Sequence, residues 1–141
     1  MCFTATASFI AGVSLLVLGV ATVKKAKRKA DIPFAMIPLL FGAQQIVEGM
    51  LWLSFRFDAP LLNVSMTYLF TLFSHVLWPM YVPFSIGLME SVAWRKKVLS
   101  VFQITGIAVG LYLLYFIIRF PVTSEVHEHM VYVLPLSLIH I

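Results

Sequence analysis

Long apolar runs alternate with short charged segments along the whole chain. A run of about 20 apolar residues is what a helix needs to cross a hydrocarbon core roughly 30 Å thick. A further apolar run begins at Met130 and reaches Ile141. We therefore predict an all-α, polytopic transmembrane helix bundle, with four complete helices and the start of a fifth. All of it forms a single transmembrane domain over 1–141, with helices at about 5–23, 33–55, 64–89 and 98–118.

Composition agrees with this pattern. Of the 141 residues, 61% are hydrophobic and 11% are charged, whereas soluble domains average about 25% charged residues. The single cysteine, Cys2, excludes an internal disulfide and a cysteine-based zinc site. The net charge of +4 lies in short clusters between apolar runs. We therefore expect the lipid bilayer as partner and no nucleic acid.

The basic residues predict an orientation. Five Lys and Arg residues lie in 24–29 and three in 95–97, whereas the intervening loop holds only Arg56. Cytoplasmic loops carry an excess of Lys and Arg. This places the N-terminus outside the cell, with both basic clusters in the cytoplasm. A lipid-binding polybasic patch is the alternative interpretation of residues 24–29.

The second apolar run contains three strongly polar residues, Gln44, Gln45 and Glu48. Helical spacing brings them near one another and near Trp52. An acidic residue at the centre of a spanning helix costs about 2.5–3.5 kcal/mol on insertion scales. The cluster predicts a buried polar site for an ion, a proton or a substrate headgroup; the alternative for the glutamines is interhelical hydrogen bonding. Pro38 is expected to kink the same run.

The third run adds His75 shortly before two prolines, Pro79 and Pro83. At 1.5 Å per residue, His75 lies about 15 Å and Glu48 about 10 Å from the outer helix ends, so the two can meet. A paired carboxylate and imidazole share a proton and titrate as one unit. The alternative is a buried histidine bonded to a backbone carbonyl. Tyr112, in the fourth run, is either an interface anchor or a fifth member of this site.

Two further patterns are weaker signals. Gly106 and Gly110 form a small-xxx-small pattern that predicts close packing on another helix. His127 and His129 form a His-x-His pair that can supply two ligands to a divalent metal. A solvated loop is the alternative interpretation of that pair.

Residues 1–9 read Met-Cys-Phe-Thr-Ala-Thr-Ala-Ser-Phe, and together with several later motifs they resemble the sequences of an uncharacterised family of bacterial integral-membrane proteins. That family opens Met-Cys-Phe-Ser-Ala-Thr-Ala-Ser-Phe, and only Thr4 departs from this pattern. The resemblance implies a bacterial inner-membrane protein of about seven helices, of which this sequence is the N-terminal part, and it brings no activity. The last five residues also resemble a translated sequencing-adapter tail. The resemblance rests on residues 1–9, 33–35, 38–42, Gln44, Gln45, Glu48, Gly49, Trp52, 73–79, 110–115 and 121–123.

Two classes of activity follow from these residues. The first is a small proton-coupled transporter that uses Glu48 and His75. The second is an intramembrane metal-dependent hydrolase, in which the same pair and His127 or His129 surround a metal. A structural membrane subunit is the third alternative. The sequence leaves the cofactor and the oligomeric state open.

Overall fold

The computed structural model describes residues 4–126 and 130–133. Within them, four helical spans are long and apolar enough to cross a membrane: Ala5–Lys25, Lys29–Arg56, Pro60–Met89 and Ala93–Arg119. This confirms the predicted all-α class with four apolar helices. The fourth helix begins at Ala93 rather than near residue 98, because the basic residues 95–97 form part of its first turns.

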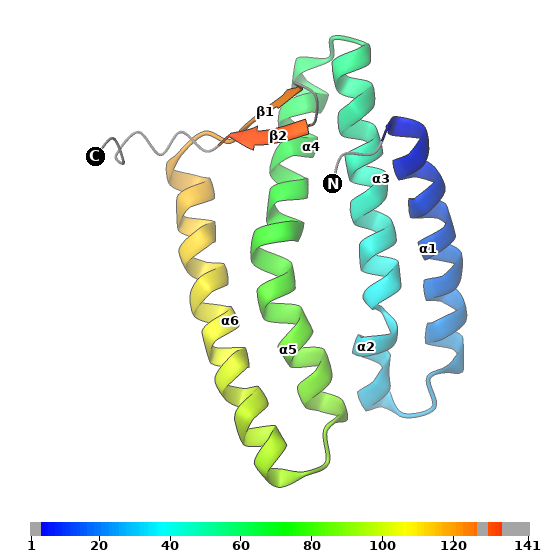
Figure 1. The fold of residues 1–141 in the computed structure, drawn as a ribbon, viewed down its shortest axis with the longest axis vertical. Helices are drawn as coiled ribbons and strands as arrows, with labels where there is room; N and C mark the ends of the chain where they lie inside the picture. The colour runs from blue at the N-terminus through cyan, green and yellow to red at the C-terminus, as the bar shows by residue number, and fades with distance from the viewer. Residues whose placement is uncertain (1–3, 127–129, 134–141) are drawn as a thin grey trace.

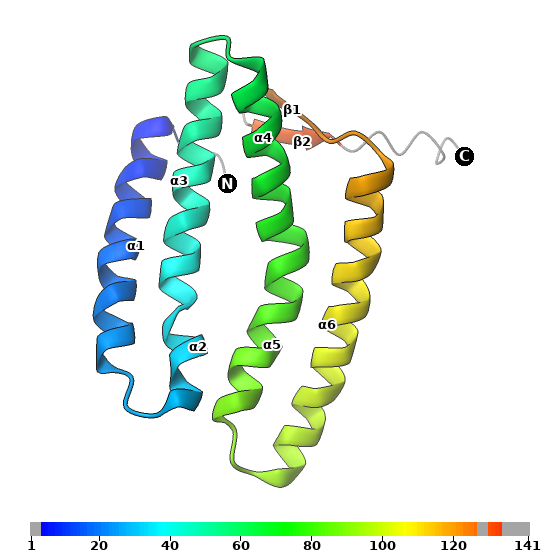
Figure 2. The ribbon, with the colours of Figure 1, turned by 180° about the vertical axis from the view of Figure 1, so that it is seen from behind.

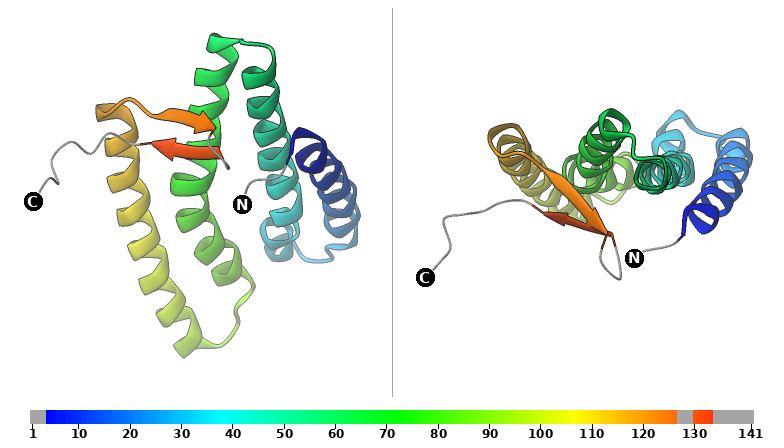
Figure 3. Two further views of the ribbon diagram at one scale, coloured as in Figure 1. Left: turned by 45° about the horizontal axis from the view of Figure 1, so that its top comes forward. Right: turned by 90° about the horizontal axis from the view of Figure 1, so that it is seen from above.

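The four spans stand side by side in one curved row (Figures 1 and 3). The first and last helices lie at the two ends of the row, and the second and third spans lie between them. In chain order the helical elements are α1 (Ala5–Lys25), η1 (Lys29–Asp31), α2 (Ile32–Ala35), α3 (Ile37–Arg56), α4 (Pro60–Thr71), the π-helical η2 (Leu72–Leu77), α5 (Trp78–Met89) and α6 (Ala93–Arg119). The third span is therefore a composite of α4, η2 and α5.

The second span is broken near its basic end. Helix α2 ends at Ala35 and α3 begins at Ile37, with Pro38 in its first turn. Proline has no backbone N–H to donate to the carbonyl of the preceding turn, and its ring clashes with that carbonyl, so the helix breaks here. The Thr22 hydroxyl of α1 donates to the Ala35 carbonyl at 2.8 Å and satisfies it. The kink expected from Pro38 is confirmed.

Helices α1 and α3 approach each other closely at glycines. A Cβ at Gly12 would lie 2.7 Å from Ile46 Cδ1, and one at Gly19 would lie 2.6 Å from the Leu39 backbone nitrogen. Close approach at small residues is the usual way in which membrane helices pack. The two helices therefore form a tightly fitted pair.

The predicted start of a fifth helix at Met130 is wrong for the described residues. Strands β1 (Thr123–Val126) and β2 (Met130–Val133) form an antiparallel hairpin, in which Thr123 pairs with Val133. Valine, tyrosine and threonine favour strands, and a partner strand within reach satisfies their backbone groups. The hairpin lies beside α4 (Figures 1 and 2). Residues 134–141 are outside the described part.

Candidate functional site

Side-chain hydrogen bonds join α3 to the third span at two levels. Trp78 Nε1 donates to Gln44 Oε1 at 2.6 Å, and Asn63 Nδ2 donates to Ser54 Oγ at 3.0 Å. The Trp78 ring also stacks on Phe41, with 4.1 Å between centroids. We give the name polar seam to the following buried and half-buried polar residues of α3, the third span and β1: Gln44, Gln45, Glu48, Ser54, Asn63, Thr67, Thr71, Ser74, His75, Trp78 and Ser124.

The third span contributes a polar stripe that begins at its hairpin end. Ser124 Oγ of β1 donates to Asn63 Oδ1 at 3.1 Å and accepts from Thr67 Oγ1 at 2.8 Å. One turn further on, Thr71 Oγ1 donates to the Thr67 carbonyl at 2.7 Å. Thr67 and Thr71 are almost completely buried. Because the stripe repeats every three or four residues, it follows one face of the helix.

His75 continues the stripe and lies inside the π-helical segment η2. Its Nδ1 atom lies 2.7 Å from Ser74 Oγ and 3.3 Å from the Thr71 carbonyl oxygen. Pro79 follows four residues later and has no N–H to donate to the His75 carbonyl. Short π-helical segments occur frequently at functional sites. His75 therefore stands where the helix is irregular and polar.

Glu48 is 4% exposed, and its Oε2 atom accepts from Gln45 Nε2 at 3.1 Å. Along α3 it lies between Gln44 and Ser54, the two residues that bond to the third span. Along the third span, His75 lies between Asn63 and Trp78, the two residues that bond to α3. Within residues 4–126 and 130–133, no hydrogen bond or ion pair joins Glu48 to His75. Their coupling as a pair stays a prediction.

Of the four buried polar side-chain atoms that lack a partner within the described residues, three lie on α3, which carries Glu48, and on the neighbouring α1. Gln45 Oε1 and Trp52 Nε1 on α3, and Ser8 Oγ on α1, are buried and lack a hydrogen-bond partner among the described residues. Buried polar groups are normally paired, so each such atom calls for an explanation. A bound solute or water would supply the missing partners.

Tyr112 is 62% exposed and stands apart from the polar seam, which contradicts its place in the buried polar site and leaves the alternative of an interface anchor. The buried glycines of α6, Gly106 and Gly110, lie against the third span: a Cβ at Gly106 would overlap the Pro79 carbonyl oxygen. Tyr112 follows Gly110 by two residues, which turns it by about 200° around the helix. It therefore points away from the interior and packs on Phe116.

The predicted metal ligands His127 and His129 lie outside the described residues, as does Cys2. In the part that the structure covers, no group of three His, Cys, Asp or Glu side chains could hold a metal ion.

The model of a family of unknown function (DUF6629) matches residues 1–141. The chain belongs to this family. Comparisons with curated proteins and with solved structures found no match. Its function therefore has to be argued from the polar seam and the fold that positions it.

Sequence reasoning missed Trp78 and Ser124. Trp78 was visible only as an aromatic residue before a proline, and nothing in the sequence pairs it with Gln44. Ser124 follows the fourth predicted helix, and nothing in the sequence pairs it with Thr67, to which it anchors the hairpin. A readable signal did exist in the spacing of Asn63, Thr67, Thr71 and Ser74, which predicts one polar helix face.

Proposed function

We propose that this protein is a membrane carrier that couples the movement of a small polar or ionic solute to protons, with Glu48 and His75 as the proton-binding groups. The observation that carries the proposal is the polar stripe of the third span. It extends from Asn63 through Thr67 and Thr71 to His75, inside a segment that is otherwise apolar.

Hydroxyl and imidazole groups suit a proton path, because each can both donate and accept. Thr67 and Ser124 already form one hydroxyl-to-hydroxyl bond, and Ser74 is bonded to the His75 ring. An ionisable residue inside a membrane helix is expensive and marks ion or proton pathways. Glu48 and His75 satisfy this description on adjacent spans.

The irregular third span supports movement as well as proton binding. Transporter sites are typically formed by discontinuous membrane helices near the bilayer midplane. Here α4 passes into π-helical η2, and α5 then begins with Pro79 in its first turn and contains Pro83. The break falls at His75, so a change in its protonation acts where the helix is least regular.

The proposal extends to location. The carrier spans the inner membrane of a bacterium, with its N-terminus outside and the clusters at 24–29 and 95–97 in the cytoplasm. The charge asymmetry of alternate loops supports this orientation, and the resemblance of the opening residues 1–9 supports the bacterial membrane.

Infrared difference spectroscopy of the purified protein tests the proton-binding pair. We expect a carboxylic C=O band that titrates with pH, disappears in Glu48→Gln and shifts its midpoint in His75→Gln. Glu90→Gln is the matched control, since Glu90 ends the third span and caps the following loop. A Glu48 band that does not respond to His75→Gln contradicts the paired site.

Solute coupling is tested separately. A panel of ions and small metabolites is added to weakly buffered protein in detergent, and proton release is followed with a pH dye. A proton-coupled carrier releases or takes up protons with its solute, and Glu48→Gln abolishes the signal. Elemental analysis of the same preparation addresses the hydrolase alternative: a stoichiometric metal that is lost in His75→Gln favours the enzyme over the carrier.

A further inference from the structure

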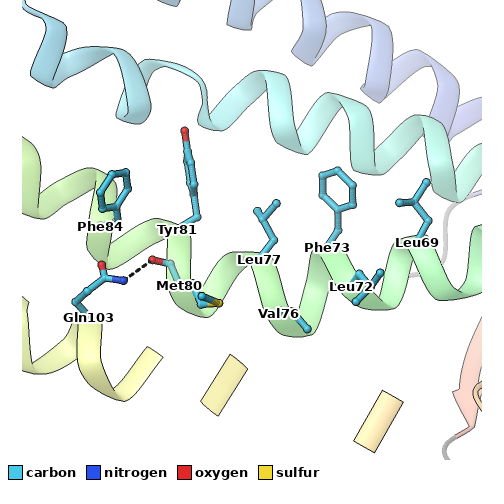
Figure 4. A pocket seen from close by; sticks show the side chains of 9 residues that line it. All are labelled: Leu69, Leu72, Phe73, Val76, Leu77, Met80, Tyr81, Phe84 and Gln103. Carbon is cyan, nitrogen blue, oxygen red and sulfur yellow. Dashed lines mark hydrogen bonds between the residues drawn. The ribbon is translucent and has the colours of Figure 1, made fainter. Parts of the chain in front are cut away.

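The third span carries a second feature, which shares no residue with the polar seam. An apolar cavity of about 480 Å³ follows the span from Leu69 to Phe84 (Figure 4). The rise of an α-helix makes this stretch about 20 Å long. Gln103 of α6 stands at one end of the cavity, and its amide donates to the Met80 carbonyl at 3.1 Å.

A smaller cavity of about 190 Å³ adjoins the first, because Phe84 and Gln103 line both. Its lining is different in character. It includes Ser100 and the ammonium-bearing side chain of Lys96, which lies in the basic cluster at residues 95–97. A long apolar cavity and a short cavity that carries a positive charge therefore lie next to each other.

The charge of Lys96 is available to a ligand. Glu90, the nearest acidic residue in sequence, lies 4.0 Å from Arg95 and also accepts the backbone N–H groups of Ser91 and Val92. Lys96 has no ion-pair partner among the described residues. Gln103 Oε1, at the junction of the two cavities, is buried and accepts no hydrogen bond within the described part.

We infer that the two cavities together bind one anionic phospholipid from the leaflet that faces the basic cluster. An acyl chain fills the apolar cavity, and the headgroup phosphate lies against Lys96. Phosphatidylglycerol fits best, because its headgroup carries a negative charge and also has hydroxyl groups that can donate hydrogen bonds to Gln103 Oε1. Basic pockets between membrane helices on the cytoplasmic side are known to bind anionic headgroups.

Native mass spectrometry of the detergent-purified protein tests this inference, with phosphatidylglycerol and phosphatidylcholine of identical acyl chains as probes. We expect one phosphatidylglycerol to bind in preference to phosphatidylcholine. Lys96→Gln should weaken phosphatidylglycerol binding about fivefold, equivalent to about 1 kcal/mol for a basic residue near an anionic surface. Lys97→Gln is the matched control: it removes the same charge from the same cluster, but Lys97 lines neither cavity.

A second variant tests the shape of the site without changing its charge. Gly87 lines the smaller cavity, and a Cβ built there meets no atom within 4 Å. Gly87→Leu should therefore fill the cavity and weaken phosphatidylglycerol binding, while circular dichroism shows a melting temperature no lower than that of the wild type. Equal binding of the two lipids, or equal losses in Lys96→Gln and Lys97→Gln, overturns the inference. So does a Gly87→Leu protein that folds normally and binds as the wild type.

Discussion

Gly106→Ala is the sharpest test of how α6 packs on the third span. The added methyl group would overlap the Pro79 carbonyl oxygen. A flexible side chain could rotate away from such an overlap, but a backbone carbonyl moves only if the helices separate. Overpacking of this kind costs about 1–3 kcal/mol, and the upper part of that range applies. Alanine recovers up to about 1 kcal/mol through its better helix propensity. The net expectation is a loss of about 1–2 kcal/mol.

Gly87→Ala provides the matched comparison, because it makes the same chemical change in another spanning helix. A Cβ at Gly87 meets no atom within 4 Å. Only the propensity gain of up to about 1 kcal/mol then applies. The two variants should differ by about 2–3 kcal/mol in the free energy of unfolding, which denaturant titration in mixed micelles followed by circular dichroism can resolve.

The reasoning fails if Gly106→Ala is as stable as Gly87→Ala. That result would mean that Gly106 faces lipid and that the contact between α5 and α6 is not the one described. A double replacement of Gly106 and Gly110 by leucine extends the test, since it should prevent α6 from packing altogether. Lipid-facing glycines would accept leucine with no change in thermal stability.

Three further outcomes are expected. A single cysteine placed at Lys27, in a protein without its native cysteine, should label only from the cytoplasm, and one at Asp58 should label from outside; the reverse pattern inverts the topology. Trp78→Phe keeps an aromatic ring but removes the interhelical donor, so stability should fall by about 0.6 kcal/mol and by no more than about 1.7; no loss would remove this bond as a link between the spans. Thr67→Val preserves shape but deprives Ser124 of its donor, and hydrogen exchange of 123–126 should accelerate; unchanged exchange would show that the hairpin is held elsewhere.

Apolar run length was enough to predict the four spans, because a bilayer requires a fixed length of apolar helix. The missing N–H of proline was enough to predict the break before Pro38. The hairpin was not predictable from run length, since the apolar residues from Met130 onward suit a strand as well as a helix. What decided between them was a partner, Thr123–Val126, that periodicity does not identify.

The candidate site was only partly readable from the sequence. Polar residues inside apolar runs identified Gln44, Glu48 and His75, because such residues are costly there. Their partners depend on how the spans are rotated and offset, which a single sequence does not specify. For the same reason the sequence left two alternatives for Tyr112, although Gly110 two residues earlier carried the information about which face of α6 is buried.

The curved row consists of two tightly packed helix pairs that meet at one interface. Helix α1 packs on α3 in one pair, and α5 packs on α6 in the other. Both contacts are made at glycines and leave almost no room for a side chain. The interface between the two pairs is held differently, by side-chain hydrogen bonds such as Trp78 to Gln44 and Asn63 to Ser54. Interhelical hydrogen bonds in membranes contribute only about 0.6 kcal/mol each on average, so they resist rearrangement less than closely packed backbones do. We therefore expect a change of charge at this interface to alter the angle between the two pairs before it distorts either pair.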